Sequence, residues 1–265
     1  MNRIDKLFAD YHQYGRKALV MYVTAGDPSL EFSERLIETI IGAGADIIEI
    51  GVPFSDPMAD GPTIQAASQR ALKGKVTIER ILEMTQRLRR KFPDIPFVLF
   101  SYYNVLMQYG VERLAEDSST AGIDGWLVVD MSNEEQDEIL PALKKCGIER
   151  ITLLAPTTGR ERMQELLHDA QGFVYYITVT GVTGARTTLP PNLAEQLQDV
   201  VNLSDIPVVA GFGVSSPDMA RAVSDKVDGV VVGSKLVQTV ADAPDSETAL
   251  RNAESLVHEL AEALH

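Results

Sequence analysis

The segment Ala45-Asp46-Ile47-Ile48-Glu49-Ile50-Gly51-Val52 carries the strongest indication of how this chain folds. It is almost continuously apolar and rich in isoleucine, which is typical of a strand that is covered on both faces. Because side chains alternate along a strand, Ile48 and Ile50 are expected to face surrounding helices and Glu49 to face the interior of a barrel. A carboxylate in that position is expected to be desolvated.

Seven more strand-like runs share this pattern, with amphipathic helical segments between them. They are residues 18–24, 97–102, 125–129, 151–155, 173–178, 208–212 and 229–232. Eight strands that alternate with helices predict a (β/α)8 or TIM barrel, a closed parallel fold of the α/β class. An open doubly wound sheet is the alternative, but it more often has about six strands and an early GxGxxG turn, which is missing here.

An extra helix is expected before the first strand, where Ile4, Leu7, Phe8 and Tyr11 stand at helical spacing. No linker or change in composition marks a boundary further along. Residues 1–265 are therefore expected to form a single TIM-barrel domain.

Three capping signals mark the expected beginnings of helices. Asp27 and Ser216 each precede a proline that suits a first helical turn. Ser132 with Glu135 fits a capping box.

The composition argues against several classes of protein. The formal net charge of −14 gives the 265 residues no electrostatic reason to bind nucleic acid or an anionic membrane. The N-terminus is charged, and no segment approaches the roughly 20 apolar residues of a membrane span. Cys146 is the one cysteine, so no intrachain disulfide can form and the cytoplasm is the expected location.

Two acidic features lie where the active site of a TIM barrel is expected, at the carboxyl ends of the strands. Burial raises the pKa of a carboxyl group, which suits Glu49 to exchange a proton near neutral pH. The alternative is a structural acid paired with a buried cation. The following loop, residues 53–62, carries Asp56 and Asp60 over the barrel mouth, where a solvated aspartate is the ordinary alternative.

Glycines gather at the ends of the last three strands, in residues 180–184, 211–213 and 233–234. Glycine lets backbone N–H groups approach an anion closely. The loops after strands seven and eight also form the common phosphate site of TIM barrels. Each glycine alone fits a plain turn, but the set predicts a phosphorylated ligand.

Aromatic side chains near the strand ends could build an apolar slot, although core packing is the ordinary role of each. They are Tyr22, Phe100, Tyr102, Tyr175 and Phe212.

None of the four histidines lies at a strand end and no lysine sits on a strand, so a histidine metal site, a Ser-His triad and a Schiff base have no support. Proton transfer by carboxylates, without a metal, is the chemistry that remains.

Residues 49–65, which read EIGVPFSDPMADGPTIQ, resemble the signature of tryptophan synthase α subunits. The resemblance runs from about Leu7 to the last helix and includes five shorter segments. They are residues 22–28, 102–104, 181–184, 211–215 and 232–234. Residues 130–132 and 185–190 depart from the family pattern, and they bear on loop closure and on contact with a partner.

The resemblance implies a lyase of tryptophan biosynthesis that cleaves indoleglycerol phosphate into indole and glyceraldehyde 3-phosphate by a retro-aldol reaction. Glu49 matches the family's general acid–base residue. Asp60 matches the carboxylate that stabilises positive charge on the indole N–H, and Thr183 matches the loop hydroxyl that meets Asp60 on closure.

The resemblance also implies the ligand contacts and a partner. The phosphate group is expected on backbone N–H groups of Gly184, Gly213, Gly233 and Ser234. The indole slot is expected to be lined by Tyr22, Phe100, Leu127, Tyr175 and Phe212. The family's α subunit pairs with a β subunit in an α2β2 tetramer, and the β subunit carries pyridoxal phosphate, so this chain is expected to hold no cofactor.

Two other functions stay open at this point. Another phosphate-binding barrel, such as a sugar-phosphate isomerase or epimerase, would share the glycines but usually needs a strand-end His, Cys or Lys. A non-catalytic barrel kept as a regulatory partner has no need of both Glu49 and Asp60.

Overall fold

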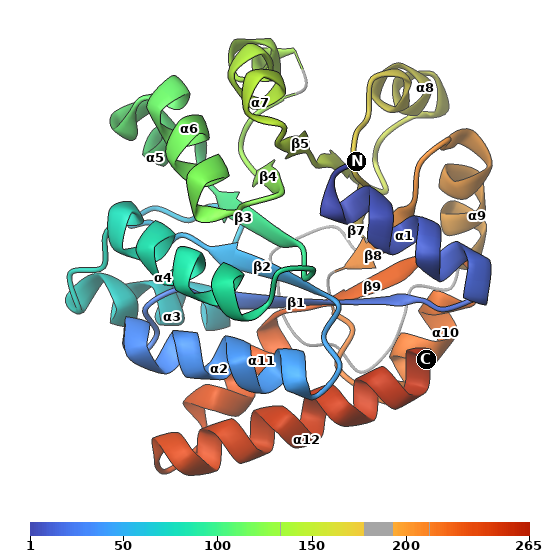
Figure 1. The fold of residues 1–265 in the computed structure, drawn as a ribbon. Coiled ribbons are helices and arrows are strands. Elements are labelled where there is room, and N and C mark those ends of the chain that lie inside the picture. The colour runs from blue at the N-terminus through green and yellow to red at the C-terminus, as the bar shows by residue number, and fades with distance from the viewer. Residues whose placement is uncertain (133, 178–192, 212) are drawn as a thin grey trace.

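The computed structural model describes residues 1–132, 134–177, 193–211 and 213–265. Within these ranges, nine parallel strand segments form one sheet in the order β5-β4-β3-β2-β1-β9-β8-β7-β6 (Figure 1). The segments are β1 (Ala18–Thr24), β2 (Ile47–Gly51), β3 (Phe97–Ser101), β4 (Gly125–Val128), β5 (Glu149–Arg150), β6 (Thr152–Leu154), β7 (Val174–Ile177), β8 (Val208–Gly211) and β9 (Gly229–Val232).

The two ends of this sheet belong to one strand. β5 pairs with β4, β6 pairs with β7, and only Ile151 separates β5 from β6 along the chain. The Ile151 N–H donates to the Trp126 carbonyl oxygen at 2.9 Å. The strand therefore pairs on one side through its first half and on the other side through its second half, which closes a staggered barrel. The predicted eight-stranded TIM barrel is confirmed, with the fifth strand beginning at residue 149 instead of 151.

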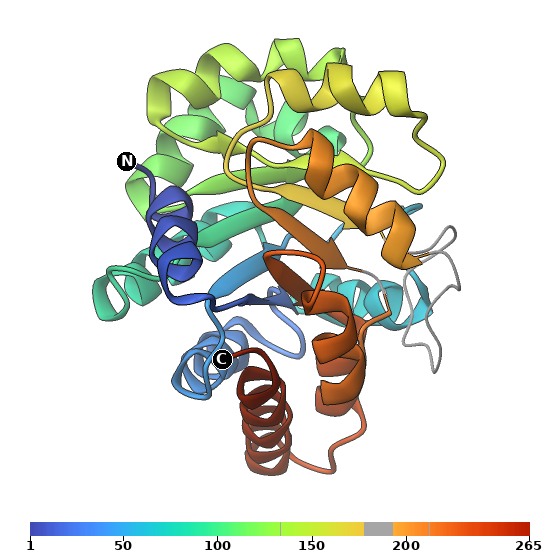
Figure 2. The same cartoon turned by 90° about the vertical axis from the view of Figure 1, so that its right-hand side faces the viewer.

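Helices cover the outside of the barrel (Figures 1 and 2). They are α1 (Arg3–Tyr14), α2 (Leu30–Gly42), α3 (Pro62–Lys73), α4 (Ile78–Lys91), α5 (Tyr103–Tyr109), α6 (Val111–Ala121), the 3-10 helix η1 (Glu135–Glu138), α7 (Leu140–Cys146), α8 (Arg160–His168), α9 (Leu193–Leu203), α10 (Pro217–Ser224), α11 (Ser234–Ala241) and α12 (Ser246–Leu264). Among these described helices, none combines the length and the hydropathy that a membrane span requires.

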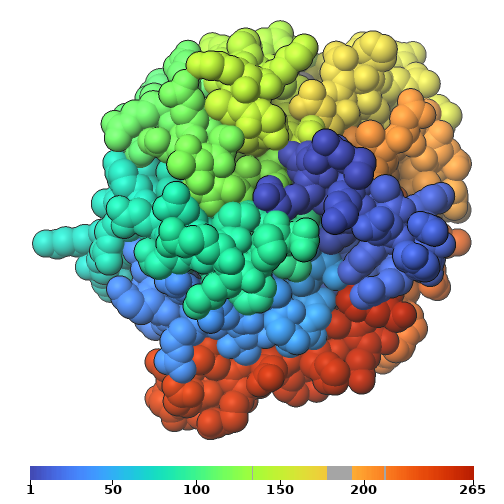
Figure 3. All heavy atoms as spheres, viewed as in Figure 1, coloured from blue at the N-terminus to red at the C-terminus, as the bar shows by residue number. Residues whose placement is uncertain are grey.

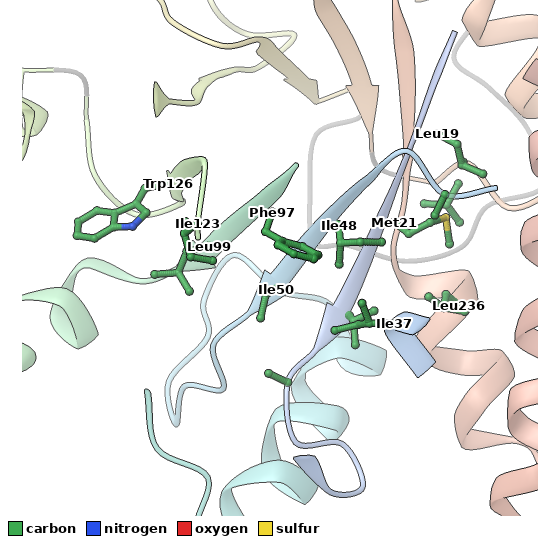
Figure 4. Packing of buried hydrophobic residues seen from close by; sticks show 14 of the residues in the cluster. Leu19, Met21, Ile37, Ile48, Ile50, Phe97, Leu99, Ile123, Trp126 and Leu236 are labelled. Carbon is green, nitrogen blue, oxygen red and sulfur yellow. The ribbon is translucent and has the colours of Figure 1, made fainter. Parts of the chain in front are cut away.

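Alternation along the strands divides the apolar side chains into two layers. Ile48 and Ile50 of β2 belong to the layer between barrel and helices, where Figure 4 shows them among residues that include Ile37 of α2. Ile47 belongs to a separate cluster inside the barrel. Because Glu49 follows Ile47 by two positions on one strand, it also faces the barrel interior, as predicted.

Helix α1 closes the end of the barrel at which the strands begin. Ile4 and Phe8 are buried in the interior cluster, and the Phe8 ring lies 5.9 Å from that of Phe173. Figure 3 shows α1, in dark blue, lying across this end, and Figure 2 shows both termini on the same side of the molecule. The predicted N-terminal helix is confirmed as the floor of the barrel, which leaves the opposite end for a ligand.

Two of the three capping predictions are confirmed. The Ser216 hydroxyl accepts a hydrogen bond from the Met219 N–H, at 3.3 Å, where α10 begins. Ser132 and Glu135 each accept from the other's backbone N–H, at 3.4 and 2.9 Å, and the helix that follows is the 3-10 helix η1.

The capping prediction for Asp27 is wrong. Helix α2 begins at Leu30, and the Ser29 hydroxyl caps it by accepting from the Phe32 N–H at 3.1 Å. Asp27 instead binds Arg70 of α3 through two hydrogen bonds of 2.7 and 2.8 Å. Asp27 and Ser29 are both good caps by residue type, but Ser29 binds the first turn of the helix and the Asp27 carboxylate is engaged by Arg70.

Candidate active site

Glu49 is buried inside the barrel on β2, with 1% of its surface exposed. Its Oε1 atom has no hydrogen-bond partner, and burial alone raises the pKa of Glu49 to about 8. A buried cation that would hold it as a structural acid is therefore not found among the described residues. A carboxyl group that titrates near neutral pH is suited to proton transfer.

Asp60 ends the loop between β2 and α3 and is also buried, with 4% exposed. Burial raises the pKa of Asp60 to about 6, and the Tyr102 hydroxyl opposes that rise. Asp56 of the same loop is exposed and accepts a hydrogen bond from Ser55. Of the two acids predicted over the barrel mouth, Asp60 is therefore buried and Asp56 faces solvent.

Two buried tyrosines lie close to both carboxyl groups. Tyr22 of β1 stands in register with Glu49 of β2, and Tyr175 of β7 belongs to the same interior cluster as Tyr22. Burial, together with the charges of Asp60 and Glu49, raises the pKa of each tyrosine well above its ordinary value. The two tyrosines are therefore close enough to the two carboxyl groups to feel their charges, and the four side chains form one cluster.

The residues predicted to line an indole slot lie close together inside the part of the barrel that the structure describes. Tyr22 and Phe100 meet edge to face, with ring centroids 5.1 Å apart and planes inclined by 76°. Phe100, Leu127 and Tyr175 are all buried in the interior cluster. Four of the five predicted slot residues are thus brought together, and Phe212 lies outside the described residues.

Two glycines make room for the tyrosine rings. A Cβ atom at Gly51 would lie 2.2 Å from the Tyr22 hydroxyl oxygen, and one at Gly211 would lie 2.3 Å from that of Tyr175. Both distances are far shorter than van der Waals contact. A larger residue at either position would displace a ring from the slot.

Three of the four residues predicted to bind the phosphate group lie within the described part of the chain. Gly233 and Ser234 are half-buried and begin α11 directly after β9. The first N–H groups of a helix lack intrahelical acceptors and the helix dipole favours negative charge there, so this end can bind a phosphate group. Gly213, with a φ of 96°, precedes α10 in a conformation that favours glycine. Thr183 and Gly184 lie outside the described residues.

Sequence reasoning missed two hydroxyl contacts. Tyr102 was predicted only as a wall of the aromatic slot, but its hydroxyl accepts from the Ala59 N–H at 3.1 Å and faces Asp60. The Thr24 hydroxyl donates to the Tyr22 hydroxyl oxygen at 3.4 Å. Both residues stand at the carboxyl end of a strand, which was the available signal, but the partner of each hydroxyl depends on the tertiary structure.

The site has no metal cluster within the described part of the chain, where no group of three His, Cys, Asp or Glu side chains is placed to hold an ion. It offers two buried carboxyl groups, an aromatic slot and a helix N-terminus. Such a set can exchange a proton, stabilise a positive charge beside an aromatic ring and hold a phosphate group.

Comparison with known families and relatives gives one consistent result. The sequence model of the tryptophan synthase alpha chain family matches residues 8–265. The tryptophan synthase alpha chain of Citrifermentans bemidjiense is 48% identical over 238 residues, which cover 90% of this chain and 89% of the relative. That of Caldanaerobacter subterraneus is 43% identical over 264 residues, which cover 100% of both chains.

Solved structures agree with the sequence comparison. Tryptophan synthase subunit alpha from Legionella pneumophila superposes with a TM-score of 0.93 at 35% identity, covering 100% of this chain and 98% of that one. Tryptophan synthase from M. tuberculosis in its aminoacrylate-bound form gives a TM-score of 0.89 at 31% identity, covering 100% of both chains. The likeness therefore extends over the whole barrel.

Proposed function

This chain belongs to the tryptophan synthase alpha chain family, and we propose that it cleaves indoleglycerol phosphate into indole and glyceraldehyde 3-phosphate by a retro-aldol reaction. As a family member it is a lyase of tryptophan biosynthesis that catalyses the alpha reaction of tryptophan synthase. The cleavage breaks the bond between indole C3 and the first carbon of the glycerol phosphate side chain. It therefore needs one proton delivered to C3 and one removed from the hydroxyl group on that carbon.

The burial of the Glu49 carboxyl group is the observation that carries this proposal, because one such group can perform both proton transfers. With a pKa of about 8 it is largely protonated at neutral pH, so it can donate to indole C3. The resulting carboxylate then accepts the side-chain hydroxyl proton as the carbon–carbon bond breaks. The bonding electrons return to the ring, the side chain leaves as an aldehyde, and Glu49 ends the cycle protonated.

Asp60 is suited to the complementary role. With a pKa of about 6 it is largely ionised at neutral pH. Protonation of C3 places positive charge on the indole nitrogen, and a carboxylate beside that N–H stabilises it in a site of low dielectric. Two carboxyl groups in different surroundings thus divide the acid–base and electrostatic roles.

The substrate is held at both ends in this proposal. The indole ring occupies the slot between Tyr22, Phe100, Leu127 and Tyr175, and the phosphate group takes N–H groups at Gly213, Gly233 and Ser234. A Cβ atom at Gly233 would lie 3.2 Å from the Tyr22 Cβ, so the phosphate end and the slot adjoin. By the family resemblance, Phe212, Gly184 and Thr183 complete the slot, the phosphate site and the contact with Asp60.

We further propose that residues 1–265 act as one cytoplasmic domain in complex with a β subunit, in an α2β2 assembly. Pyridoxal phosphate would then belong to the partner, and this chain would hold no cofactor of its own. The family resemblance supports this arrangement, as does the likeness to tryptophan synthase of M. tuberculosis.

The direct test is indole release from indoleglycerol phosphate by the purified chain, with and without a β subunit. Indole and glyceraldehyde 3-phosphate are expected in equal amounts, and faster with the partner present. Conversion of the substrate without indole would favour an isomerase or epimerase. No turnover in either condition would leave a regulatory barrel as the better description.

A further inference from the structure

We propose that Tyr102 is a positioning residue for the alpha reaction: it anchors the loop at residues 52–61 and directs its hydroxyl proton to the Asp60 carboxylate. The inference rests on the proposed function, in which Asp60 must be ionised beside the indole N–H. Beyond that function, the inference identifies Tyr102 as the residue that holds Asp60 in place and keeps its carboxyl group ionised.

Tyr102 contacts the loop at both ends. Its ring stacks on Phe54 near the loop's beginning, with centroids 5.0 Å apart and planes inclined by 29°. Its hydroxyl oxygen accepts from the Ala59 N–H near the loop's end, at 3.1 Å. Since Tyr102 itself is 3% exposed and directly follows β3, a rigid strand end holds the loop from inside.

The Ala59 contact also sets the direction of the hydroxyl proton. A phenol oxygen that accepts from one N–H keeps its own O–H for another acceptor. The Asp60 carboxyl group is on the residue after Ala59, and hydrogen bonding from Tyr102 lowers the Asp60 pKa against the effect of burial. Hydrogen bonds of this kind often tighten only when the substrate is bound.

Tyr22 and Tyr175 do not replace Tyr102 in this role. Their pKa values respond to the charge of Asp60, but among the described residues the hydrogen bond that acts on the Asp60 pKa comes from Tyr102. Both rings are instead seated over Gly51 and Gly211 in the slot. The three tyrosines therefore separate into two that line the slot and one that holds the loop.

The variant Tyr102→Phe tests the proposal because it keeps the ring on Phe54 and removes only the hydroxyl. Loss of the donor raises the Asp60 pKa above about 6, so the acidic limb of the kcat/KM profile moves to higher pH. For a one-unit rise, kcat/KM would fall about fivefold at pH 6, about twofold at pH 7 and hardly at pH 8. KM for the substrate should change less than kcat, because Asp60 acts on charge that develops in the reaction.

Tyr103→Phe is the matched control. Tyr103 is the next residue, and its hydroxyl donates to Glu138 at 2.6 Å on the exterior. This variant should keep the wild-type profile. An equal loss at every pH in Tyr102→Phe, or an acidic limb that moves no further than in Tyr103→Phe, would show a merely structural role and overturn the proposal.

Titration of the Asp60 carboxyl carbon by NMR in the ligand-free chain separates this inference from the proposed function. The Asp60 pKa should rise in Tyr102→Phe even if the chain proves unable to cleave indoleglycerol phosphate, and an unchanged value refutes the role of Tyr102. A 3-fluorotyrosine at position 102 is a stronger donor of nearly the same shape. It should lower the Asp60 pKa, and a rise would also contradict the proposal.

Discussion

At the scale of single residues, Glu49 and Asp60 carry the same functional group in different surroundings. Glu49 has a pKa of about 8, and Asp60 has a pKa of about 6. Catalysis needs Glu49 protonated and Asp60 ionised, so kcat/KM for indoleglycerol phosphate should rise through pH 6 and fall through pH 8. Rates measured from about pH 5 to about pH 9 check this. A profile that is flat, or that keeps rising above pH 8, contradicts the assignment.

The seating of Tyr22 over Gly51 makes a second prediction at this scale. Gly51→Ala places a Cβ atom 2.2 Å from the buried Tyr22 hydroxyl oxygen and should displace the ring. Misplacement of a substrate-binding group by about 1 Å can cost about 100-fold in rate, so kcat/KM should fall by one to two orders of magnitude. Gly42→Ala, where nothing lies within 4 Å of the new Cβ, is the control and should keep wild-type kinetics. Equal kinetics in both variants would show that Tyr22 does not shape the slot.

At the scale of elements, the helices after β8 and β9 begin where a phosphate group is proposed to bind. Gly213→Val should weaken binding of glycerol phosphate by at least about tenfold and leave indole binding nearly unchanged, because a side chain there displaces the anion from backbone donors. Gly147→Val is the control, since Gly147 also has a positive φ, of 68°, and its carbonyl oxygen accepts from Asn2 beside the floor helix α1, away from the site. Titration calorimetry with each ligand measures both affinities. If Gly213→Val weakened the binding of both ligands equally, the phosphate group would have to bind at another place.

The strands were predictable because each is a short, nearly continuous apolar run that the local sequence shows by itself. The division of the fifth strand at Ile151 was not, because it depends on pairing with two neighbours that are distant in sequence. The cap of α2 was misplaced for a similar reason, since Arg70 of another helix binds Asp27. Local signals thus located the elements, and contacts between elements set their ends.

At the scale of the whole molecule, the contacts that stabilise the floor of the barrel lie at the opposite end from the active site. Helix α1 closes the floor with Phe8, far from the opposite end where the strands terminate. Phe8→Ala should lower the free energy of unfolding by about 3–5 kcal/mol because it leaves a cavity, while kcat of the folded enzyme stays unchanged. Asp10→Ala, at an exposed position of the same helix, should change neither the free energy of unfolding nor kcat. Denaturant unfolding checks the first effect, and a large loss of kcat in Phe8→Ala would show that floor and site are coupled.

The site was predictable only as far as residue types and strand ends allow. Glu49 could be placed inside the barrel because alternation along one strand fixes its direction. The hydroxyl of Tyr102 could not be assigned to the loop, because an aromatic residue at a strand end looks the same whether it packs in the core or holds a neighbouring segment. Thr183, Gly184 and Phe212 stay predictions that rest on the family resemblance.

Glu49→Gln gives the most direct measurement of the central claim, that one buried carboxyl group moves both protons. The amide keeps the shape but cannot exchange protons, so indole release should fall by about 10²–10⁴, with little change in substrate affinity. Folding can be checked in the same sample. The protonated Glu49 stabilises the fold fully below about pH 4.5, and that stability is lost as the pH rises through about 8, so the variant should be the more stable protein above that pH. A folded Glu49→Gln chain that releases indole at nearly the wild-type rate would contradict the account.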